Sequence, residues 1–119
     1  MSATIREARR ADLAAIGAIE RASFGDPWSR RMFEAHLAAN GGNAFLVAED
    51  GDRIVGYAIT QTVRDESELL NIAVDPASRK QGMGALLLDA AIERCGSAGA
   101  LEMWLEVRES NAGARSLYD

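Results

Sequence analysis

The chain has 119 residues, of which 48% are hydrophobic and 26% charged, and its net charge at pH 7 is −5. This length predicts a single domain over residues 1–119, and the acidic balance argues against non-specific nucleic-acid binding. No apolar run is long enough to cross a membrane, and one cysteine (Cys95) with one histidine (His36) provides neither an internal disulfide nor a metal-ligand cluster. We therefore expect a cytoplasmic protein with no metal and with no nucleic-acid or membrane partner.

The first third of the chain predicts a strand followed by two helices. Thr4–Ala8 is expected to form a short strand. Asp12 is expected to cap a helix that runs to about Phe24, because apolar residues recur there at helical spacing. Glycine and proline at positions 25 and 27 break that helix, and Ser29 is expected to cap a second, shorter one.

Three strands are predicted next. Ala44–Glu49 and Arg53–Val63 are joined by Asp50-Gly51, which is a strong hairpin signal. An acidic turn then leads into Leu69–Val74, a nearly unbroken apolar run that is typical of a strand covered on both faces. The strand is expected to end at Asp75-Pro76, because proline has no backbone N–H to donate.

A glycine-bearing loop, Arg79–Gly84, leads from that strand into a helix expected over Ala85–Cys95. Glycines allow a tight bend and a close approach to a ligand, and a helix N-terminus offers free N–H groups with a positive dipole end. With Arg79 and Lys80 beside it, the loop favours a phosphate or pyrophosphate. Its spacing fits neither a Walker loop nor a dinucleotide fingerprint, which would need a glycine at Leu87. The plain alternative is a surface turn that precedes a helix.

The last part of the chain predicts a strand over Ala100–Val107 and a helix that starts at Asn111. Along the strand, apolar residues alternate with Glu102, Trp104 and Glu106. The whole order of elements predicts an α/β fold with a mixed sheet.

These motifs together resemble the GCN5-related N-acetyltransferase (GNAT) superfamily, whose acyl-CoA pyrophosphate loop is similar to Arg79-x-x-Gly82-x-Gly84. More specific segments are similar to the bacterial ribosomal-protein alanine N-acetyltransferases; these are Asp26–Ser29, Asn71–Pro76, Trp104–Arg108 and Asn111–Tyr118. The resemblance extends over essentially the whole chain. It implies the GNAT fold, with acetyl-CoA as cosubstrate and a protein N-terminal peptide as partner.

The resemblance further implies an enzyme that moves an acetyl group from acetyl-CoA to a protein N-terminal α-amine. The expected acceptor is the N-terminal alanine of a small-subunit ribosomal protein. A peptide lysine or a small-molecule amine is the alternative acceptor, and a non-catalytic acyl-CoA-binding domain is the alternative outside enzymes.

Two catalytic residues follow from the same resemblance. Glu106 is expected to be the base that deprotonates the amine through water, and Tyr118 the acid that protonates the departing thiolate. The alternatives are a solvated glutamate on the polar face of a strand and a tyrosine that only packs.

The resemblance also implies which residues hold the coenzyme. Backbone groups of Ile72, Ala73 and Val74 are expected along the pantetheine arm, with the Val74 N–H as an oxyanion donor. The expected pyrophosphate loop consists of Arg79, Lys80, Gln81, Gly82, Met83 and Gly84, and Asn111 is expected to contact the coenzyme. Residues 26–29 are expected to line the entrance for the acceptor peptide, although tryptophan burial and a serine cap explain them equally well.

The family continues past Leu117-Tyr118 into two further strands, which this chain is expected to lack. An open edge on the Ala100–Val107 strand would then favour self-association. Loss of those strands would also weaken acceptor selectivity and catalysis.

Overall fold

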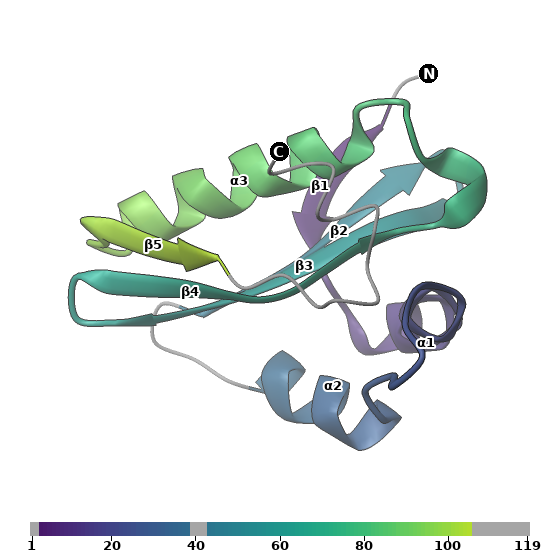
Figure 1. Ribbon diagram of the computed structural model, residues 1–119, viewed down its shortest axis with the longest axis horizontal. Coiled ribbons are helices and arrows are strands. Elements are labelled where there is room, and N and C mark those ends of the chain that lie inside the picture. The colour runs from purple at the N-terminus through teal and green to yellow at the C-terminus, as the bar shows by residue number, and fades with distance from the viewer. Residues whose placement is uncertain (1–2, 39–42, 106–119) are drawn as a thin grey trace.

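The computed structural model describes residues 3–38 and 43–105 of the chain. These residues form one five-stranded sheet (Figure 1), whose strands lie side by side in chain order. The strands are β1 (Thr4–Glu7), β2 (Ala44–Asp50), β3 (Arg53–Val63), β4 (Glu66–Val74) and β5 (Glu102–Leu105). The first four pair antiparallel and β5 runs parallel to β4. The predicted mixed sheet is therefore confirmed.

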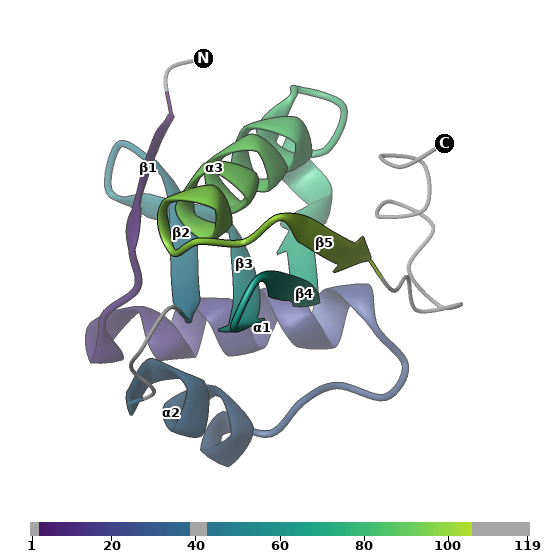
Figure 2. The same ribbon diagram turned by 90° about the vertical axis from the view of Figure 1, so that its left-hand side faces the viewer.

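Helices cover both faces of the sheet (Figures 1 and 2). One face carries α1 (Leu13–Ser23) and α2 (Arg30–Ala38), and the other carries α3 (Met83–Ser97). Short 3-10 turns, η1 (Arg10–Asp12) and η2 (Pro76–Ser78), precede α1 and follow β4. No helix in the described ranges is long and apolar enough to cross a membrane.

The core on the α1 and α2 face is built from residues at helical spacing. Leu13, Ile16 and Ile19 are buried along α1 and pack with Phe33 of α2 against Tyr57 of β3. The rings of Phe33 and Tyr57 meet edge to face with their centroids 5.6 Å apart, an arrangement that aromatic pairs favour.

The core on the other face depends on a close approach between α3 and the sheet. Leu87 of α3 is fully buried there. A Cβ atom at Gly56 of β3 would lie 2.8 Å from Leu87 Cδ1 and 3.0 Å from the Ala73 carbonyl oxygen. Because glycine has no side chain, α3 can pack closely against β3 at Gly56.

Two helix predictions need correction. The helix after the glycine loop begins at Met83, not Ala85, so Gly84 lies in its first turn. Leu86 of the same helix is apolar but 44% exposed. The helix buries a row of residues at four-residue spacing against the sheet, and Leu86 lies outside that row.

Asp12 is the residue before α1, but its side chain makes no capping hydrogen bond to that helix, so the predicted cap is wrong. Its carboxylate accepts from the Arg9 N–H at 2.7 Å and pairs with the Arg6 guanidinium at 2.9 Å. The hydrogen bond from Arg6 holds the pKa of Asp12 below its usual range. Ser29 does cap α2, because its hydroxyl accepts from the Met32 N–H at 3.3 Å.

Two strand boundaries also differ from the prediction. β4 begins at Glu66, since residues 66–69 pair with β3 on one side and with β5 on the other. β5 begins at Glu102, and Leu101 lies before it with an exposed fraction of 81%. The sequence pattern thus predicted only the apolar part of β4, and the structure adds the polar and charged residues at its start.

Candidate active site

The candidate active site lies where β4 continues beyond the described part of β5. β5 pairs with β4 only from Glu66 to Leu69. At this point β4 carries a bulge: Ile59 pairs with Asn71 and Thr60 with Leu69, which leaves Leu70 as an extra residue. Bulges bend a strand and redirect the residues beside them. The bend thus falls directly after Leu69, the last residue of β4 that pairs with the described part of β5.

Strand alternation settles which backbone groups of β4 face the edge on the β5 side. Asp75 N–H donates to the Val55 carbonyl of β3 at 2.8 Å. Alternate residues of an antiparallel strand point their N–H and C=O groups to opposite sides. Ala73 therefore points its backbone groups to β3, whereas Ile72 and Val74 present theirs to the other edge. Of the three predicted pantetheine contacts, Ile72 and Val74 share one edge and Ala73 does not.

The glycine loop leaves the end of this edge and enters α3. Lys80 and Gly82 both have positive φ angles, 65° and 81°, and Gly82 is the residue before the first helical turn. Lys80, Gln81 and Gly82 are exposed, so their backbone can be approached from solvent. The Met83 side chain is buried in the core, so any ligand contact from Met83 must come from its backbone. The exposed loop and the free first-turn N–H groups are suited to an anion.

Arg79 is placed differently from the other loop residues. Its Nε donates to the Val74 carbonyl at 3.1 Å, and its NH2 group donates to the Ser23 hydroxyl at 3.0 Å. The guanidinium therefore ties the start of the loop to β4 and to the end of α1. In this arrangement Arg79 positions the loop, and Lys80 is the exposed cation beside it. No motif in the sequence indicates that Ser23 accepts a hydrogen bond from Arg79.

The predicted acceptor entrance, residues 26–29, connects α1 to α2 on the same side of the molecule as the β4 edge (Figure 2). Trp28 stacks on His36 of α2, with ring centroids 5.3 Å apart and planes tilted by 20°. His36 is half-buried in this stacked pair, and its burial lowers its pKa. The Trp28 N–H donates to the Glu20 carboxyl at 2.6 Å.

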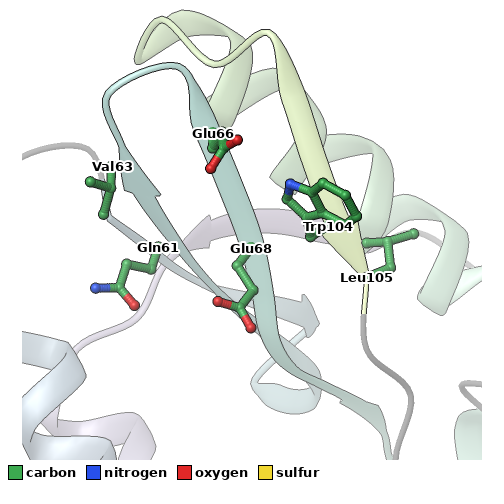
Figure 3. A pocket seen from close by; sticks show the side chains of 6 residues that line it. All are labelled: Gln61, Val63, Glu66, Glu68, Trp104 and Leu105. Carbon is green, nitrogen blue, oxygen red and sulfur yellow. The ribbon is translucent and has the colours of Figure 1, made fainter.

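A groove of about 400 Å³ lies beside the α1 and α2 layer, where β3, β4 and β5 run together (Figure 3). Gln61, Glu68 and Trp104 are cross-strand neighbours in register, so their side chains share one face. Trp104 is 60% exposed. An indole face beside carboxylates is suited to a cationic side chain. The remaining residues that line the groove are Val63, Glu66 and Leu105.

Three predicted site residues, Glu106, Asn111 and Tyr118, lie outside the described residues. Within residues 3–38 and 43–105, no three His, Cys, Asp or Glu side chains come together as a metal site. The site described here is therefore the predicted coenzyme half without Asn111, and it consists of the edge of β4, the glycine loop and the start of α3.

Comparison with known proteins agrees with this geometry. The profile of the acetyltransferase (GNAT) family matches residues 13–119. A ribosomal protein bS18-alanine N-acetyltransferase of Salmonella typhimurium is 42% identical over 108 residues, covering 91% of this chain and 72% of that protein.

Solved structures give the same result. The crystal structure of the ribosomal-protein-S18-alanine N-acetyltransferase from Escherichia coli has a TM-score of 0.84 and 37% identity, covering 98% of this chain and 74% of that one. Ard1 from Thermoplasma volcanium has a TM-score of 0.86 and 28% identity, covering 99% and 80%. The predicted fold class and family are confirmed: the chain belongs to the GNAT acetyltransferase family.

Proposed function

We propose that this chain transfers the acetyl group of acetyl-CoA to the N-terminal alanine of the ribosomal protein bS18. The observation that carries the proposal is the 42% identity, over 91% of the chain, to a relative named for that activity. The coenzyme half of the site supports it, because backbone groups of β4 and the start of α3 lie together in one unit.

The described residues fit an acyl-CoA molecule. The Val74 N–H points to the side of β4 opposite β3, where an extended pantetheine arm can pair as a strand does. The loop at Lys80–Gly82 is exposed, and a Cβ atom at Gly82 would meet nothing within 4 Å. A pyrophosphate can therefore approach the first-turn N–H groups of α3. Bound acetyl-CoA supplies the acetyl thioester.

The chemistry requires the amine to lose its proton, the thioester oxygen to accept a hydrogen bond as it becomes anionic, and the thiolate to gain a proton. The proposed roles are Glu106 as base through water, the Val74 N–H as oxyanion donor, and Tyr118 as acid. An α-amine has a free pKa of about 8, whereas a lysine amine is near 10.4, so a carboxylate suffices as its base. This difference favours an N-terminal acceptor over a lysine.

The acceptor surface is proposed to combine residues 26–29 with the groove around Trp104. The carboxylates of Glu66 and Glu68 beside this indole suit a peptide with basic residues (Figure 3).

Titration calorimetry with acetyl-CoA, together with thermal melting, tests the proposal. We expect saturable one-site binding and a higher Tm, since a ligand at 100 times its Kd stabilises the fold by about 2.7 kcal/mol. Transfer is then measured on a peptide that starts with alanine. The control is the same peptide with a blocked N-terminus and an internal lysine.

Each outcome of this test has a separate meaning. Transfer only to the free alanine supports the proposal, and transfer to the blocked peptide points to a lysine acetyltransferase. Binding without transfer to any amine would leave an acyl-CoA-binding domain. Absence of binding by a chain that melts cooperatively would overturn the assignment of the coenzyme site.

Replacement of Gly82 by alanine is expected to weaken acetyl-CoA binding. Space is open around this residue, so the cost arises from its φ of 81°, a conformation that costs a side-chain-bearing residue about 1–2 kcal/mol. Relaxation of that strain moves the first-turn N–H groups away from the pyrophosphate, and we expect Kd to rise about tenfold. Calorimetry with acetyl-CoA gives the measurement.

Gly96→Ala is the matched control for this variant. Gly96 lies in the same helix, also with open space around it, but without a positive φ. We expect it to leave Kd unchanged and to add slightly to stability. Equal effects of the two variants on Kd would show that the backbone conformation at Gly82 is not needed for binding.

A further inference from the structure

Glu20 of α1 is a charged residue type that lies completely inside the protein, with an exposed fraction of 0%. Burial of a carboxyl group is costly unless hydrogen bonds replace its water. Apolar residues of similar size often stabilise such a position better than a polar group does. A role other than stability is therefore worth seeking for Glu20.

Three donors from three separate parts of the fold converge on this carboxyl group. The Tyr57 hydroxyl of β3 donates to Oε1, and the Asn71 amide of β4 donates to the same atom at 2.8 Å. The Trp28 backbone N–H donates to Oε2 at 2.6 Å. A carboxylate only accepts hydrogen bonds, so its two oxygens can satisfy all three donors at once.

Two of these donors belong to the two sides of the proposed active site. Asn71 lies next to the bulge at Leu70 and directly before Ile72, whose backbone faces the coenzyme edge. Trp28 belongs to the connection between α1 and α2, which is proposed to receive the acceptor peptide. Arg79 also links β4 to α1, because it donates hydrogen bonds to Val74 near the end of β4 and to Ser23 at the end of α1.

We infer that Glu20 is a positioning residue that sets the distance between the acceptor segment, residues 26–29, and the coenzyme edge of β4. This inference rests on the proposed function, because it assumes that acceptor and coenzyme meet there. Glu20 is buried and acts through Trp28 and Asn71. A small displacement of the acceptor segment disturbs binding of the peptide and moves its amine away from the thioester.

Glu20→Gln is the informative substitution, because it keeps the shape of the side chain and replaces one acceptor oxygen by a donor. At least one of the three hydrogen bonds is then lost, and a donor faces a donor. We expect KM for the alanine-start peptide to rise about tenfold. The Kd for acetyl-CoA, measured by calorimetry, is expected to change less than about twofold, because the loop and α3 keep their contacts.

Two control variants separate positioning from stability. Ile16→Val removes a methyl group from a buried position of the same helix and leaves the carboxyl group with its donors. Tyr57→Phe removes the hydroxyl donor on β3 and leaves the hydrogen bonds from Trp28 and Asn71 to Glu20. Both are expected to lower Tm and to leave KM for the peptide unchanged. If either raises KM as much as Glu20→Gln does, the positioning role is wrong.

Amide hydrogen exchange gives a readout that does not depend on activity. In Glu20→Gln, exchange is expected to accelerate at least about tenfold at Trp28 and at residues 71 and 72 together, with α3 unchanged. Uniform acceleration over the whole chain would overturn the inference. A wild-type chain that transfers to no peptide would refute the proposed function, and the exchange pattern would still decide whether Glu20 ties these two segments.

If Glu20→Gln does not fold, Asn71→Ser provides the second variant, because the shorter side chain cannot reach the carboxyl group from β4. It is expected to raise KM for the peptide in the same direction. An unchanged KM would contradict the inference.

Discussion

Replacement of Glu106 by glutamine is expected to lower kcat for transfer to an alanine-start peptide by about 10²–10⁴-fold, the usual contribution of a general base. Glutamine keeps the size of the side chain but cannot accept a proton from the amine or from a bridging water. Acetyl-CoA binding is expected to persist, because the proposed coenzyme contacts lie on β4, on the glycine loop and in the segment from Asn111. The measurement combines single-turnover transfer with calorimetric titration of acetyl-CoA.

The control for this variant is Glu102→Gln. Glu102 is an exposed residue at the start of β5 and lies four positions before Glu106, on the same face of the predicted strand. Its replacement is expected to leave kcat unchanged. A Glu106→Gln variant with the wild-type rate would show that the base is another group, or that the amine arrives already deprotonated.

Replacement of Leu87 by alanine is expected to destabilise the fold by about 2–5 kcal/mol, because it removes a fully buried side chain and leaves a cavity. The cavity would lie where α3 packs against Gly56 of the sheet. The first turn of α3 carries the proposed pyrophosphate contacts, so we also expect weaker acetyl-CoA binding. Urea unfolding with and without acetyl-CoA gives both quantities.

Leu86→Ala is the control for this effect. Leu86 is the preceding residue of the same helix and is 44% exposed, so its loss is expected to change stability by no more than about 0.5 kcal/mol. Similar losses for the two leucines would contradict the packing of α3 described here.

The local features of this fold were predictable because they depend on neighbours in the chain. The hairpin at Asp50-Gly51 is confirmed, and Gly51 has the positive φ of 64° that such a turn requires. The serine cap of α2 and the left-handed Gly82 before α3 are likewise short-range features. The family was identifiable for the same reason, since its motifs are runs of adjacent residues.

The tertiary structure alone decided which distant groups meet. Arg79 and Ser23 are 56 residues apart, and Glu20 and Asn71 are 51 apart. No periodicity relates such positions, so the sequence indicated neither the contact of Arg79 with Ser23 nor that of Glu20 with Asn71. The start of β4 at Glu66 depends in the same way on pairing with two neighbouring strands. Backbone propensity and turn chemistry act within a few residues, whereas a buried hydrogen bond or a bulge exists only once separate elements have packed together.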